Sequence, residues 1–270
     1  MNIDDMTVLQ TSKDPDALCE AALQIASQKN PEALRVLGER IGDEAFLGLL
    51  DSEQDYHSSP ETLNVSGVLE TLGGNPDPSA QNILVQLTQD QVFSAMLSRV
   101  EMLILACADI RPVPARILTF WTLQTGPDSS SNPLVVEALF TNGTAPAMTL
   151  FETMMTDPSY PTSDKIFWLL TYAVPHRDDP CFLEAAERVI KTNADQEMTI
   201  EWIRIIFDYQ VTWYPPMDMP KPPNPIAISP EGKELLLKIG NNALALENLP
   251  ASLKSAIETR LKMYRETEKQ

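Results

Sequence analysis

The feature that most constrains this chain is a helical pattern that recurs three times between residues 112 and 193. Each recurrence begins at a proline followed by a small residue, at Pro114, Pro146 and Pro180, with intervals of 32 and 34 residues. One apolar helical segment follows each proline and a second precedes the next recurrence. Helix pairs that recur about every 30 to 45 residues are typical of α-solenoids. The pattern therefore predicts an all-α fold of stacked antiparallel helix pairs.

Helix starts are marked by a dipeptide in which Asp, Asn or Ser precedes proline. The polar side chain can accept hydrogen bonds from the free amides of a first turn, and proline already has a helical φ. The eight dipeptides are Asp14-Pro15, Asn30-Pro31, Ser59-Pro60, Asp77-Pro78, Asn132-Pro133, Asp157-Pro158, Asp179-Pro180 and Ser229-Pro230. Most of them precede an apolar helical pattern, which makes them predicted helix starts.

Apolar spacing predicts the remaining helices, one of which is expected to be central. The predicted ranges are 16–28, 31–50, 60–72, 78–87, 90–108, 195–212, 230–246 and 250–266. The helix over 90–108 is apolar on most faces, so we expect it at the centre of the fold. The segment Ile166–Val174 is apolar all round and is expected to be buried on both sides, with Trp168 in the core.

The helical pattern breaks at Tyr214–Pro225, where six of twelve residues are proline. Neither a helix nor an inner strand accommodates that composition, so residues 213–228 are expected to form an extended connector. Trp213 and Tyr214 precede the prolines. The favoured interpretation is that they pack on this segment, and the alternative is a ligand for an SH3-like or WW-like domain. We expect one repeat domain over 1–270, with core repeats at about 60–212 and capping helices over 229–267.

The net negative charge of the chain limits the classes of molecule that it is expected to bind. The formal net charge is −18, and residues 1–61 hold thirteen acids against four bases. Such a surface repels phosphate backbones, so nucleic acid is not expected to bind, and a basic protein or peptide is the expected partner. No apolar run approaches the ~20 residues that span a bilayer. The acidic N-terminus lacks the pattern of a signal peptide, and the three cysteines lack metal-ligand spacing, so a cytoplasmic chain is expected.

No motif in the sequence indicates a catalytic, cofactor or metal site. Phosphate-binding glycine loops and a GxSxG nucleophile elbow are absent, and only two histidines are present. The densest polar cluster is His176-Arg177-Asp178-Asp179. The favoured interpretation is a turn whose last residue, Asp179, caps the next helix. The alternative is a small partner-binding site formed by His176, Arg177 and Asp178.

The spacing and the proline-started helix pairs resemble HEAT and armadillo repeats over about residues 60–212. The resemblance implies a right-handed superhelix whose concave surface binds proteins. It favours a non-catalytic interaction module or scaffold. The alternative is an enzyme on a helical-repeat scaffold, similar to alkylpurine DNA glycosylases or bilin lyases. A glycosylase would need a basic groove, and the acidic composition counts against it.

Overall fold

A computed structural model describes residues 3–51, 65–192, 194–208 and 229–266, and every regular element in these ranges is a helix. The all-α prediction is therefore confirmed. The chain divides into two compact units, Met1–Asn142 and Gly143–Gln270, which we call the N-terminal unit and the C-terminal unit. The expectation of a single repeat domain stays a prediction.

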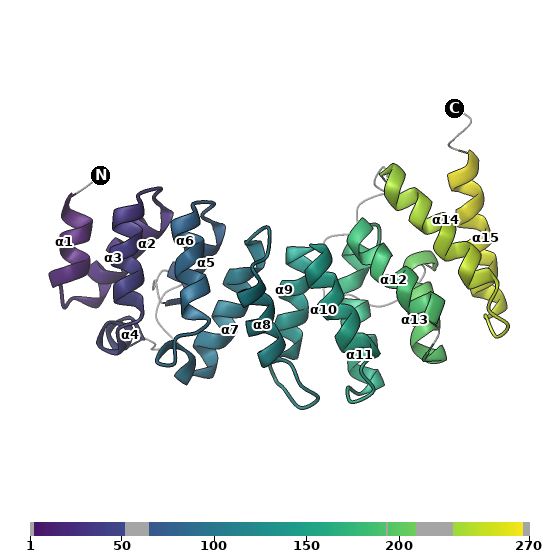
Figure 1. The fold of residues 1–270 in the computed structure, drawn as a ribbon, viewed down its shortest axis with the longest axis horizontal. Coiled ribbons are helices and arrows are strands. Elements are labelled where there is room, and N and C mark those ends of the chain that lie inside the picture. The colour runs from purple at the N-terminus through teal and green to yellow at the C-terminus, as the bar shows by residue number, and fades with distance from the viewer. Residues whose placement is uncertain (1–2, 52–64, 193, 209–228, 267–270) are drawn as a thin grey trace. The chain divides into compact units, whose positions relative to one another are not determined.

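The N-terminal unit contains nine α-helices within the described ranges (Figure 1). They are α1 (Ile3–Thr11), α2 (Pro15–Ser27), α3 (Pro31–Ile41), α4 (Glu44–Asp51), α5 (Val65–Gly74), α6 (Pro78–Leu87), α7 (Leu97–Ala106), α8 (Ala115–Gln124) and α9 (Asn132–Asn142). Helices α2, α5, α7 and α9 contact one another in that order, and α3 contacts α6. The backbones of α5 and α7 approach so closely that a Cβ on Gly73 would lie 2.4 Å from the Ala106 carbonyl oxygen.

The C-terminal unit contains six α-helices in its described part. They are α10 (Ala145–Thr156), α11 (Thr162–Trp168), α12 (Pro180–Thr192), α13 (Gln196–Phe207), α14 (Pro230–Leu244) and α15 (Ala251–Glu266). Helix α12 contacts both α10 and α14, and α13 contacts both α11 and α15. Two sets of helices are therefore packed in sequence order within this unit.

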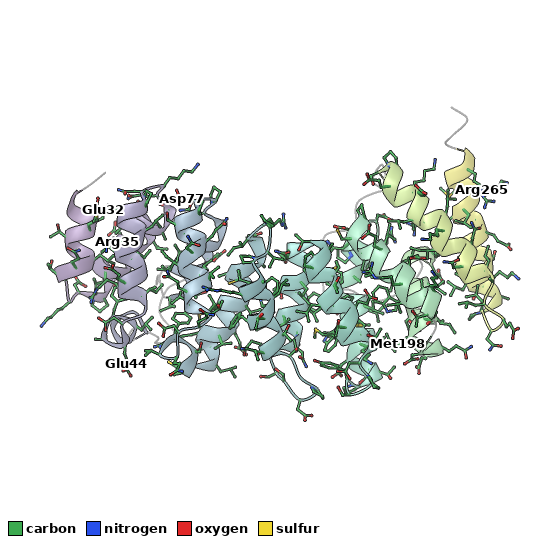
Figure 2. All side chains as sticks on the ribbon, in the orientation of Figure 1. Glu32, Arg35, Glu44, Asp77, Met198 and Arg265 are labelled. Atoms are coloured by element: carbon green, nitrogen blue, oxygen red, sulfur yellow. The ribbon has the colours of Figure 1, made fainter. Side chains whose placement is uncertain are left out.

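Five of the predicted dipeptide starts are confirmed as helix caps. Asp14, Asn30, Asp77 and Ser229 accept hydrogen bonds from first-turn amides of α2, α3, α6 and α14, and Asp179 does so for α12. Figure 2 labels Asp77 at the start of α6. Each cap satisfies an amide that a helix terminus otherwise leaves without a partner. Ser59-Pro60 lies outside the described residues.

Two dipeptides do not cap helices. Asp157 follows α10 and accepts the Ser159 amide at 2.8 Å, which closes a turn, and α11 begins only at Thr162. Asn132 is the first residue of α9, and its side chain instead bonds the amide and carbonyl of Gly126. The helix start predicted at Asn132-Pro133 is confirmed, although the Asn132 side chain does not cap it. Only Asp157-Pro158 is wrong as a helix start, because a short polar side chain before proline also serves turns.

The single long helix expected over 90–108 is wrong. The Asp90 carboxylate accepts the amides of Val92 and Phe93 at 2.8 and 3.0 Å, which starts a short 3₁₀ turn. The backbone is then extended at Met96, with φ −113° and ψ 124°, and α7 begins at Leu97. Met96 and Leu97 are exposed as a result, 45% and 57%. Local hydrogen bonding of an aspartate competes with the helix here.

Buried aromatic residues form the core of the C-terminal unit. Trp202 of α13 stacks on Phe182 of α12, with ring centroids 5.1 Å apart, and lies 5.8 Å from the ring of Phe151 on α10. Trp168 is buried at 2% exposure, as expected. Its neighbour Phe167 is 45% exposed, so the prediction that Ile166–Val174 is buried on both sides is wrong.

Candidate functional site

The polar cluster expected at residues 176–179 lies at the corner between α11 and α12. After α11 the chain makes a π-helical turn over Leu169–Ala173 and a 3₁₀ turn over Val174–His176. The Asp179 amide donates to the His176 carbonyl at 2.9 Å, and the Asp179 carboxylate accepts the Cys181 amide at 2.9 Å. The predicted turn and helix cap are confirmed. We call residues 176–179 together with Arg260 the polar corner.

Asp178 is the acidic centre of the polar corner. Its Oδ1 atom lies 2.9 Å from Nη2 of Arg260, and its Oδ2 atom lies 3.7 Å from Nε of Arg177. All three side chains are largely buried, with exposures of 19% for Asp178, 15% for Arg260 and 11% for Arg177. A mostly buried carboxylate between two guanidinium groups is electrostatically matched, and the Arg260 contact is a charge-assisted hydrogen bond.

Arg260 connects the corner to two further helices. It belongs to α15 and also donates to the Ile206 carbonyl at the C-terminal end of α13. A cation at a helix C-terminus is favourable because the last carbonyls carry the negative end of the helix dipole. Sequence reasoning missed Arg260, because 82 residues separate it from Asp178 and the spacing within α15 indicates only an exposed basic face.

Burial shifts the pKa values of two side chains at the polar corner, His176 and the adjacent Cys181. Burial lowers the pKa of His176 below its usual value, and the nearby Asp179 carboxylate opposes that shift. Burial raises the pKa of the Cys181 thiol, and the negative charges of Asp179 and Glu184 raise it further. His176 is therefore biased toward the neutral imidazole and Cys181 toward the neutral thiol. The thiolate is the nucleophilic form of cysteine, so this environment does not activate Cys181.

Structurally, the polar corner acts as a junction between elements. It brings together His176, Arg177 and Asp178 as the sequence suggested, whereas Trp213 and Tyr214 lie outside the described residues. Within the described ranges, no group of three or more His, Cys, Asp or Glu side chains could hold a metal ion. Through Arg260, the polar corner holds α15 against α13 and the start of α12.

A second charged arrangement follows the helices α10, α12 and α14. Arg188 on α12 donates from Nε to Glu152 Oε2 on α10 at 2.8 Å. On the same helix, Glu187 Oε1 lies 3.3 Å from Nζ of Lys238 on α14. Each neighbouring pair of helices in this row is therefore bridged by one glutamate and one basic side chain.

Comparison with known proteins finds no matching family model, no similar curated protein and no similar solved structure. None of the helices in the described part of the chain is both long and apolar enough to cross a membrane.

Proposed function

We propose that this chain is a non-catalytic interaction protein, an α-solenoid scaffold that binds a protein or peptide partner on its concave face. The observation that carries the proposal is the order of packing in the C-terminal unit. First helices contact first helices, α10 with α12 and α12 with α14, and second helices contact second helices, α11 with α13 and α13 with α15. Stacking of successive helix pairs in this order is what a solenoid requires.

The N-terminal unit supports the same reading. Its helices α2, α5, α7 and α9 pack in sequence order, and α3 packs on α6. A right-handed superhelix of the HEAT or armadillo kind is the form we propose for these stacks. Small-angle X-ray scattering of the full chain tests it, because a solenoid gives an elongated particle. A compact particle, with a radius of gyration near the ~18 Å of a globular chain this long, would contradict it.

The partner we propose is a protein with an exposed basic segment. The chain has 38 acidic residues against 20 basic ones, so its field attracts cations and repels phosphate backbones. Electrostatic steering accelerates the association of oppositely charged proteins, and salt weakens it beyond a Debye length of about 8 Å at physiological ionic strength.

Affinity capture with the tagged full chain, followed by a salt titration of the purified partner, tests this function. We expect a protein whose affinity falls steadily between low and high salt. An affinity that is constant or rises with salt would mean an apolar interface and an incidental acidic surface. Tight binding to duplex DNA in the same buffers would contradict the proposed function altogether.

A further inference from the structure

The helices α2, α5, α7 and α9 of the N-terminal unit each carry one glutamate on their solvent side. These residues are Glu20, Glu70, Glu101 and Glu137, which we call the glutamate row. Glu20, Glu70 and Glu137 are exposed, and Glu101 is half-exposed. The packing order of the four helices places the glutamates in the same order along the row.

Packing leaves these helices only one free side. Helix α5 has α2 and α7 as flanking neighbours, and α7 has α5 and α9. Helices α3, α6 and α8 cover another side, because α3 packs on α2, α6 on α5 and α8 on α9. On α9 every residue except Glu137 and Thr141 is at least partly covered. The exposed glutamates therefore lie on the side of the row that faces away from α3, α6 and α8.

Among the described residues, no ion pair involves any of the four members of the glutamate row. The corresponding row of the C-terminal unit differs, because Arg188 and Lys238 contact its glutamates. Helices α6 and α8 carry no acidic residue, and α3 carries exposed Glu32 and Glu39, of which Glu39 is paired with Arg35.

The middle of this face is also apolar. Leu105 lies one helical turn after Glu101 on α7 and is 38% exposed, and Met102 beside it is half-exposed. Residues four apart share a helix face. A face that combines carboxylates with exposed apolar side chains suits a peptide that is basic and carries an apolar residue at its centre.

We propose that the glutamate row, with Leu105 and Met102 at its middle, is the docking face for an extended basic segment of the partner. Packed helices lie about 8–10 Å apart. A polyproline II segment advances about 3.1 Å per residue, so side chains three residues apart are about 9 Å apart. Basic residues at every third position therefore match one glutamate per helix. The inference rests on the proposed function and specifies the partner segment.

Fluorescence anisotropy with a labelled synthetic peptide tests the docking face. The probe carries four lysines, one at every third position, with alanine and proline between them and one central leucine. A second peptide of equal composition has its lysines contiguous. The full chain is compared with a row variant, Glu20→Gln, Glu70→Gln, Glu101→Gln and Glu137→Gln, whose helicity is checked by circular dichroism.

A control variant removes the same number of charges elsewhere. Its changes are Glu44→Gln, Asp128→Asn, Glu234→Gln and Glu258→Gln, all at exposed positions, and Glu44 is labelled on α4 in Figure 2. Both variants lose four negative charges, so a general effect of net charge weakens both equally.

We expect the row variant to bind the spaced peptide about tenfold more weakly, because four solvated ion pairs each contribute modestly. The control variant should bind within about twofold of the unchanged chain, and the contiguous peptide more weakly than the spaced one. Equal losses in both variants, equal binding of both peptides, or no binding of the spaced peptide would overturn the docking face. A captured basic partner that binds the row variant unchanged would refute this face and leave the proposed function standing.

Discussion

Among the described residues, ion pairs join different helices in the C-terminal unit but not in the N-terminal unit. In the N-terminal unit, neighbouring helices are joined by hydrogen bonds from side chains to backbone carbonyls. Asn75 donates from Nδ2 to the carbonyls of Ala26 and Gln28 at the C-terminal end of α2, at 2.7 and 2.9 Å. Asn142 on α9 donates in the same way to Ala108 and Ile110, at 2.9 and 3.0 Å. Both asparagines are buried, at 5% and 2% exposure.

The C-terminal unit uses aromatic stacking and ion pairs for the same task. Phe182 and Trp202 join α12 to α13, and Asp178 and Arg260 join the α11–α12 corner to α15. The difference shows which carboxylates are already paired within the fold and which are not. In the C-terminal unit, Glu152, Glu187 and Asp178 form ion pairs between helices, whereas no member of the glutamate row does so among the described residues.

The largest expected effect is on the aromatic core. Trp168→Ala should lower the free energy of unfolding by about 3–5 kcal/mol, because truncating a buried aromatic leaves a cavity. Trp168 also makes an edge-to-face contact with Tyr160, with ring centroids 5.6 Å apart. The matched control is Phe167→Ala, which changes a 45% exposed neighbour and should cost less than about 1 kcal/mol. Denaturant unfolding followed by circular dichroism measures both, and equal losses would contradict the assigned packing.

A smaller effect is expected at the polar corner. Asp178→Asn keeps the size of the side chain and removes the charge that Arg260 and Arg177 face. The loss should be about 1.5–3 kcal/mol, the contribution of a hydrogen bond between charged groups. Glu152→Gln, at the more exposed pair with Arg188, should cost less than about 1 kcal/mol. Native-state hydrogen exchange should show faster exchange in α15 for Asp178→Asn, and unchanged protection there would argue against the role given to Arg260.

In the N-terminal unit the matching test is Asn75→Ala. It leaves the carbonyls of Ala26 and Gln28 without this donor, at an expected cost of about 1–2 kcal/mol. Asn75→Asp should cost more at neutral pH, because it places a carboxylate against carbonyls at the negative end of α2. Because the Asn75 amide is neutral, the cost of Asn75→Ala should be the same in low and high salt. If the loss in free energy of unfolding becomes smaller as salt rises, the Asn75 contact depends on charge, and the proposed difference between the two units is wrong.

The smallest expected effect concerns pH. Burial lowers the pKa of His176 in the folded chain, so below about pH 6.5 the unfolded chain binds more protons at His176 than the folded chain does. The contribution of His176 to stability is therefore full above about pH 6.5 and is lost as pH falls through the folded pKa. His176→Gln should flatten the dependence of unfolding free energy on pH in that range. A variant with the same slope as the unchanged chain would show that His176 titrates alike in both states.

Much of the fold could be predicted from the sequence because helix starts and apolar spacing are local signals. Asp14, Asn30 and Asp77 act on amides within three residues, so their dipeptides are sufficient to identify them. Asp157 also precedes proline but forms a turn instead. Which of the two outcomes occurs depends on packing that a single dipeptide does not encode.

The candidate site was predictable only in part. His176, Arg177 and Asp178 are adjacent in sequence, so their clustering needs no tertiary information. Arg260 is different, since its contact with Asp178 forms only when α15 packs on α13. The glutamate row was equally hidden, because its members become neighbours through the stacking of α2, α5, α7 and α9 and not through any spacing in the chain.

The packing of the last two helices has a consequence for the integrity of the chain after proteolysis. Helix α14 contacts α12, α15 contacts α13, and Arg260 bonds the end of α13 as well as Asp178. These contacts join residues on either side of 209–228 without using the peptide bonds of that stretch. A chain cut there would remain a non-covalent complex of two fragments, whose dissociation would depend on protein concentration.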